Sequence, residues 1–178
     1  MKYTIPIMLC AMLAGAAHGQ SIAQVYDRPV TNAEKEMVSL TEAMPADKYN
    51  FAPTAGEFAG VRTFALQVRH LATVIYEVSS ASLGEKMPVE TGKNENGSDK
   101  LATKEQIVPY LKDAFALAHR AALALAAGNL TDKVKSPFGE GTITRVACVE
   151  IALWHSYDHY GQMVVYARLN GVIPPASR

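Results

Sequence analysis

Cysteine is scarce in this chain, and its scarcity excludes a fold held together by internal disulfides. Of the two cysteines among 178 residues, Cys10 lies in an apolar leader and Cys148 lies near the start of the last helical pattern. Once the leader is removed, a single thiol remains and cannot form an internal disulfide. Stability must therefore come from a packed core, to which a bound metal ion could add.

An excess of positive charge is also missing. The chain has 17 basic and 17 acidic side chains, and loss of Lys2 with the leader leaves a net charge of about −1. Proteins that bind nucleic acids or anionic membranes through charge carry basic patches or runs. The sequence therefore predicts no nucleic-acid partner and no polybasic membrane contact.

The one long apolar run is at the start of the chain. Lys2 precedes an apolar stretch from Ile5 to Ala17, and Ala17-His18-Gly19 offers small residues before a cleavage point. This order is typical of a secretory signal peptide, and the run is too short to span a membrane comfortably. We expect a signal peptide at 1–19, a single domain at 20–178 without stable membrane insertion, and export to the periplasm or the extracellular space.

Strand patterns are nearly absent, and apolar residues instead recur at spacings of three and four. The helices expected from this periodicity span about 30–43, 61–83, 103–127 and 142–170. Residues 20–29 read as an extended lead-in, and Pro109 predicts a kink or short break in the third helix. The polar segment 85–100 reads as a flexible crossover. The predicted fold class is all-α, a four-helix bundle.

The last helical pattern contains two histidines four residues apart, His155 and His159. That spacing places both imidazoles on one helix face, one turn apart, where they can chelate a divalent metal. The same face is mostly apolar, so it should point into the core, and buried imidazoles need partners. A metal would satisfy both rings, and hydrogen bonds to neighbours or water would do so as well.

Other candidate residues have a simpler reading beside the functional one. Cys148 is a soft metal ligand or a small buried residue. Glu57 could serve the site or remain a solvated loop carboxylate. His70 alone is more often a core or boundary residue, and His119 lies on a flank outside the site. The sequence lacks H-E-x-x-H, so a zincin-type protease is not indicated.

Three stretches of the sequence together resemble the DinB superfamily of helical-bundle metalloproteins. They are Leu40–Pro53 with Gly56-Glu57-Phe58, then Val61–Ala72, and His155-Ser-Tyr-Asp-His159-Tyr-Gly-Gln. The resemblance implies an up-down-down-up bundle with a long crossover between the second and third helices. It also implies that His70 joins His155 and His159 as a ligand of one divalent ion, for which zinc, nickel, iron and manganese are candidates.

Three nitrogen ligands leave a coordination position for water or substrate, as in catalytic metal sites. Nearby polar groups would orient the rings, and the candidates are Gln67, Glu77, Asp158 and Gln162. No general base or nucleophile is visible, so the catalytic residues stay unassigned.

Two functional readings remain open. One is a metal-dependent hydrolase or group transferase acting on a small molecule, and the other is a non-enzymatic metal-binding or stress-related bundle. A homodimer is compatible with either. Some relatives use low-molecular-weight thiols inside the cell, a chemistry that export would disfavour here.

Overall fold

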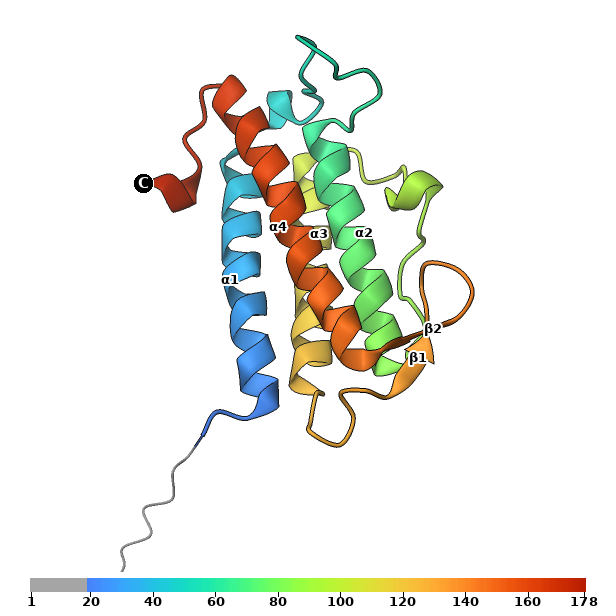
Figure 1. Ribbon diagram of the computed structural model, residues 1–178. Helices are drawn as coiled ribbons and strands as arrows, with labels where there is room; N and C mark the ends of the chain where they lie inside the picture. Colours follow the sequence, from blue (N-terminus) through green and yellow to red (C-terminus); the bar gives the residue numbers. More distant parts are fainter. Residues whose placement is uncertain (1–18) are drawn as a thin grey trace, which may run out of the picture.

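Four long helices make up most of the structure, a computed structural model that describes residues 19–178 (Figure 1). Their bounds are α1 Ile22–Ala43, α2 Phe64–Leu83, α3 Lys104–Leu123 and α4 Arg145–Leu169. Single turns of 3₁₀-helix occur at η1 Ala46–Lys48, η2 Lys93–Glu95 and η3 Pro175–Ser177. The expected signal peptide lies, except for Gly19, outside the described residues. Among the helices described, none is long and apolar enough to cross a bilayer.

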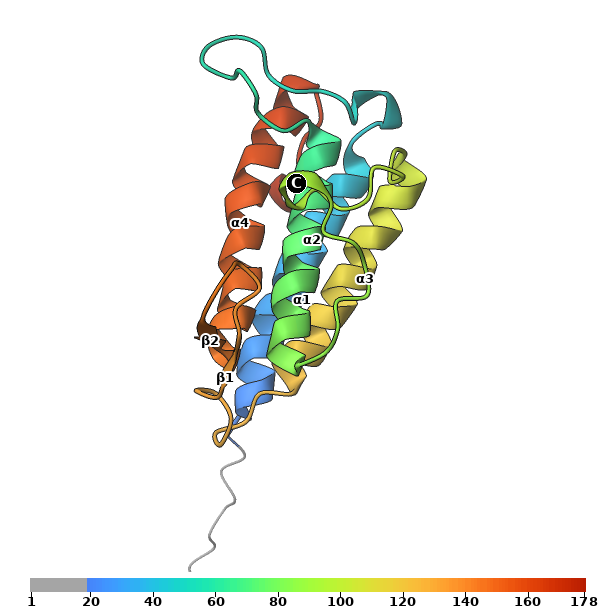
Figure 2. The ribbon, with the colours of Figure 1, turned by 90° about the vertical axis from the view of Figure 1, so that its right-hand side faces the viewer.

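The helices run up, down, down and up, as Figure 1 shows. Helices α2 and α3 are therefore parallel, and the segment between them returns along the whole bundle (Figure 2). Helix α2 packs against both α3 and α4, while α1 packs against the other sides of the same two helices. This arrangement confirms the predicted four-helix bundle and the predicted crossover.

The first helix begins well before the predicted start, so the extended lead-in at 20–29 was wrong. Ser21 caps α1, with its hydroxyl accepting from the Gln24 amide at 3.2 Å and the Gln24 side chain accepting from Ser21 N. This capping box satisfies amides that a helix start otherwise leaves unpaired. The helix continues through Pro29, and contacts on both sides of the proline, from Asp27 and Glu34 to His119 of α3, offset its local cost.

Three other boundaries differ from the predictions. Helix α2 begins at Phe64, because the Thr63 hydroxyl accepts from Leu66 N at 3.3 Å and caps it there. Helix α3 is not broken at Pro109 and ends at Leu123. The expected start of α4 at 142 is a strand instead: β2 (Thr142–Thr144) pairs antiparallel with β1 (Lys133–Lys135). Its β-branched Thr-Ile-Thr sequence favours that conformation.

The core lies between the helices and follows the predicted apolar stripes. The fully buried side chains on α2 include Phe64, Val68, Leu71, Ile75 and Val78. In the segment between α1 and α2, Tyr49 is buried, whereas Phe58 is 41% exposed. A helix that is buried on most of its surface, as α2 is, places polar residues inside as well.

The crossover is held against α2 more firmly than its composition predicted. The buried guanidinium of Arg69 donates to the carbonyls of Asn96 at 2.9 Å and Ser98 at 2.8 Å. Arg62 donates to the Asn96 side chain at 2.9 Å and to the Asn94 carbonyl at 3.1 Å. Charge-assisted hydrogen bonds of this kind are stronger than neutral ones. Both arginines thus fix the crossover beside one half of α2.

Candidate metal centre

Helices α2 and α4 bring three histidines together in the interior of the bundle. His70 comes from the second turn of α2, and His155 and His159 come from the middle of α4. His70 and His159 are 5% and 4% exposed, and His155 is half-buried. The ring centroids lie 4.4 Å apart for the α4 pair and 5.1 and 5.0 Å from His70 to His155 and His159.

One nitrogen from each ring lies within 4.8 Å of one from each of the others. The Nε2 atoms of His70 and His155 are 3.2 Å apart. Two ligands at about 2.0–2.1 Å from one tetrahedral ion would be separated by roughly 3.3 Å. The three histidines are therefore positioned to hold one metal ion.

The crossover orients the ring of His70. Its Nδ1 donates to the backbone carbonyl of Glu95 at 3.1 Å, which leaves the lone pair of Nε2 free and facing His155. Asn94 and Glu95 both have positive φ, 55° and 57°, a conformation that residues other than glycine rarely adopt. Strained backbone of this kind clusters at functional sites, and here it aims a carbonyl at the histidine.

A chain of side-chain amides orients His159. Its Nδ1 lies 2.5 Å from Gln67 Oε1, and Gln67 Nε2 donates to Gln162 Oε1 at 3.0 Å. Gln162 Nε2 in turn donates to Asp158 Oδ2 at 3.4 Å. Because the amide oxygen of Gln67 accepts from Nδ1, the Nε2 of His159 is left for a ligand. Three of the four residues expected to orient the rings therefore form one chain to His159.

The electrostatics of the site favour neutral imidazoles. Burial lowers the pKa of His159 to about 3, helped by the neighbouring His155 and His70. Burial also lowers the pKa of His155 to about 4, with His70 as the next cause. For His70, burial and then the Arg62 charge lower the pKa. Neutral imidazole is the form that binds metal, so the site needs no proton release near neutral pH.

The other sequence candidates lie elsewhere. Cys148 is fully buried, and burial raises the pKa of its thiol to about 11, so it is a packing residue. Glu57 is exposed in the loop before α2. His119 bridges α3 to α1, with Nδ1 2.5 Å from Asp27 and Nε2 3.1 Å from Glu34. Glu77, the fourth candidate to orient a ring, makes no hydrogen bond to the histidines and instead lines a separate cavity.

Sequence reasoning missed the part that the crossover plays. Residues 85–100 read as a linker, yet the Glu95 carbonyl contacts His70 and its carboxylate lies 3.9 Å from the same nitrogen. Arg62 and Arg69 hold that segment in place. Arg62, just before α2, and Arg69, on α2, are a weak signal in the sequence, because their role is evident only when the crossover is seen beside them.

Comparison with known proteins agrees with this architecture. A sequence model of the DinB superfamily matches residues 30–163, a span that contains all three histidines. The chain belongs to the DinB superfamily. A search of curated proteins finds no significant match.

Solved structures of DinB-like proteins share the fold. A DinB-like protein from Bacillus cereus has a TM-score of 0.68 and 18% identity, over 88% of this chain and 97% of that one. A conserved protein from Enterococcus faecalis has a TM-score of 0.66 and 18% identity, over 85% and 98%. A DinB family protein from Exiguobacterium sibiricum has a TM-score of 0.62 and 17% identity, over 85% and 93%. At such low identity these likenesses show the fold alone.

Proposed function

We propose that this DinB superfamily protein binds one divalent metal ion through His70, His155 and His159 and uses it in the chemistry of a small molecule. The observation that supports this best is the convergence of one nitrogen from each ring within 4.8 Å. Three imidazoles leave at least one coordination position for a substrate, as catalytic sites require. A divalent ion here would supply Lewis-acid chemistry, polarising a substrate atom or lowering the pKa of a bound water or thiol.

The protein's own residues would orient and shield the centre. The Glu95 carbonyl and the Gln67 amide oxygen hold the Nδ1 protons of His70 and His159, so that both Nε2 lone pairs face inward. The half-buried His155, next to the exposed Trp154 at a ring distance of 5.5 Å, marks the side open to a substrate. No nucleophile is part of this arrangement, so the arrangement does not distinguish a hydrolase from a group transferase.

A non-enzymatic bundle is the second candidate function, and the 3.2 Å separation of two Nε2 atoms keeps it open. That distance also suits an N–H···N hydrogen bond in which His155 donates from Nε2 to His70. With a metal, His155 would instead carry its proton on Nδ1. Nitrogen-15 NMR of His155 before and after addition of zinc distinguishes the two tautomers.

Elemental analysis of untagged protein purified from its native host tests the metal proposal directly. We expect close to one equivalent of a divalent metal, lost on dialysis against a chelator and lost in a His155→Ala, His159→Ala double variant. Folded protein that holds no metal in stoichiometric amount, and takes up none when offered zinc, nickel, iron or manganese, would contradict the metal proposal. The three histidines would then be held by hydrogen bonds alone.

We also propose that the chain is exported and cut after Gly19, that it can form a homodimer, and that it has no nucleic-acid partner. The support for export is the order of charged, apolar and small residues in 1–19. Mass spectrometry of protein from the periplasm or medium should show Gln20 as the first residue. A full-length product retained in the cytoplasm would contradict export.

A further inference from the structure

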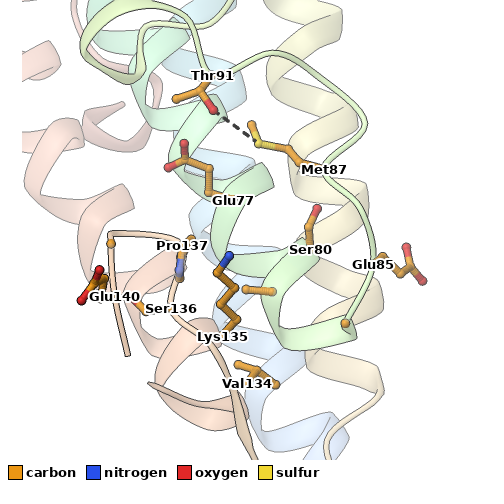
Figure 3. A pocket seen from close by; sticks show the side chains of 13 residues that line it. Glu77, Ser80, Glu85, Met87, Thr91, Val134, Lys135, Ser136, Pro137 and Glu140 are labelled. Carbon is orange, nitrogen blue, oxygen red and sulfur yellow. Dashed lines mark hydrogen bonds between the residues drawn. The ribbon is translucent and has the colours of Figure 1, made fainter. Parts of the chain in front are cut away.

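One cavity in the described part of the chain is not lined by the histidines. It has a volume of about 810 Å³ and lies between the last two turns of α2, the first part of the crossover and the loop of the β1–β2 hairpin (Figure 3). This volume is within the range of small-molecule sites. Its walls come from two stretches distant in sequence: the end of α2 with the first part of the crossover, and the β1–β2 hairpin.

Two buried polar atoms on the wall of this cavity have no partner among the described residues. They are Oε2 of Glu77, a side chain 8% exposed, and Oγ of Ser80, a side chain 3% exposed. Both residues line the cavity and lie three apart on α2, so they are neighbours on the helix surface. Leaving a buried carboxylate and hydroxyl unpaired is costly, and such atoms in a native protein call for a ligand or ordered water.

We propose that this cavity binds a small organic molecule through its primary ammonium group, which Glu77 holds. A carboxylate oxygen only accepts hydrogen bonds, and an ammonium group offers three donors. The unpaired carboxylate oxygen of Glu77 can therefore accept one of these donors. The opposite charge also offsets the cost of a buried carboxylate, which a neutral hydroxyl ligand would not do.

The rest of the cavity suits a short carbon chain attached to that ammonium group. Met87 and Val134 provide apolar wall, and Pro137 belongs to the hairpin loop at one side (Figure 3). Glu85, also at the wall, is already paired with Arg120 at 2.6 Å. Lys135 is exposed at the cavity and can turn outward or meet an anionic group at the far end of the ligand.

The state of Glu77 is consistent with this role. Burial first, and the negative charge of Glu95 second, raise the pKa of Glu77 to about 7, against a smaller lowering by Thr91. The carboxyl group is therefore ready to ionise when a cation approaches. Glu77 is seven residues after His70 on the same face of α2, roughly 10 Å along the helix. The ammonium site is thus separate from the metal centre and does not depend on whether a metal is bound.

The experiment uses n-butylamine, 5-aminopentanoate and pentanoate as probes of the folded mature protein, with and without chelator. Ligand-observed NMR at pH 7.5 measures binding, and amide shifts locate it. We expect both amines to bind and to shift Glu77 and Ser80, while pentanoate does not bind. Glu77→Gln should weaken the amines at least tenfold, and Ser80→Ala should weaken them less. The matched control Glu140→Gln, an exposed glutamate of the same cavity, should leave binding unchanged.

Several results would overturn the proposal. Binding of pentanoate equal to that of the amines would show an apolar cavity without charge recognition. Amine binding that survives Glu77→Gln would place the site elsewhere. Amines that bind only after Lys135→Ala would show that Lys135 itself occupies the place of the ammonium group. If no probe binds and the signals of Glu77 and Ser80 are unchanged, the two unpaired atoms are hydrated by water. None of these results depends on metal content, so they are distinguishable from failure of the metal proposal.

Discussion

Nε2 of His155 lies 3.2 Å from Nε2 of His70, although 85 residues separate the two in the sequence. The contact exists only when α2 and α4 pack side by side, as they do in the bundle (Figure 1). An ion that needs both rings must therefore bind the folded protein and not the unfolded chain. Metal binding and stability are linked for that reason.

Metal should raise the melting temperature, and the rise should depend on the histidines of α4. At a metal concentration a hundredfold above the dissociation constant, linkage predicts about 2.7 kcal/mol of added stability. His155→Ala or His159→Ala should abolish most of this rise, measured by thermal melts with zinc, nickel or manganese against chelator. His119→Ala is the matched control, because His119 is tied to Asp27 and Glu34 on α1, and it should keep the rise. Loss of the rise in the His119 variant would contradict the assignment.

Acid should destabilise the metal-free protein through the same three histidines. The pKa values of His155 and His159 are lowered to about 4 and about 3, and that of His70 is also lowered. Below the histidine pKa of about 6.5 in the unfolded chain, the unfolded chain therefore binds protons that the folded protein does not bind. The contribution is fully present above pH 6.5 and is lost as the pH falls toward 3. Urea unfolding of chelated protein at pH 7.5 and 5 should show this loss, and His155→Ala, His159→Ala should reduce it.

His119 should show the opposite dependence on pH. Its partial burial opposes protonation, but the hydrogen bonds and charges of Asp27 and Glu34 outweigh burial and raise its pKa. A raised histidine pKa stabilises the fold below the unfolded value and loses that effect as pH rises through the folded one. His119→Gln should therefore cost more stability at pH 5 than at pH 9, by urea unfolding. Equal losses at both pH values would show that His119 acts only by packing.

Gln67→Ala should weaken metal binding without removing a ligand. The Gln67 amide oxygen is the acceptor for His159 Nδ1, and loss of such an orienting partner typically costs 10–100-fold in metal affinity. Gln162→Ala, one step further from the ring, should cost less. Competition with a chromophoric chelator measures both affinities. An affinity in Gln67→Ala equal to that of the unchanged protein would mean that the fold alone fixes the ring.

The sequence predicted most of this architecture, because helical periodicity is a local property. The stripe on α2 and the spacing of His155 and His159 could be read directly, whereas membership of His70 came from the family resemblance. The lead-in to α1 was misread because proline is unfavourable inside a helix, whereas the capping box at Ser21 starts the helix well before Pro29. The role of the Glu95 carbonyl could not be predicted, since it depends on where a crossover of ordinary polar composition comes to rest.

Glu77→Gln should make the protein more stable at alkaline pH in the absence of any amine. The folded pKa of about 7 is well above the ordinary glutamate value of 4.5, chiefly because the carboxyl group is buried and secondarily because Glu95 is near. Between those values the folded protein binds the proton more tightly, so the free energy of unfolding falls as pH rises from about 4.5 to 7. That difference between the folded and ordinary pKa corresponds to roughly 3 kcal/mol.

Glutamine stays neutral at every pH and keeps the size of the side chain, so the variant should match the unchanged protein at pH 4.5 and exceed it at pH 8. Urea unfolding at the two pH values measures the difference. Lys135, the cation at the same cavity, is the group that could cancel the effect, and Lys135→Ala should then enlarge it. Glu140→Gln should show no such trend, because its carboxylate is exposed. Parallel stability curves for Glu77→Gln and the unchanged protein would mean that Glu77 is already paired or hydrated, and that the cavity holds no charge in need of a ligand.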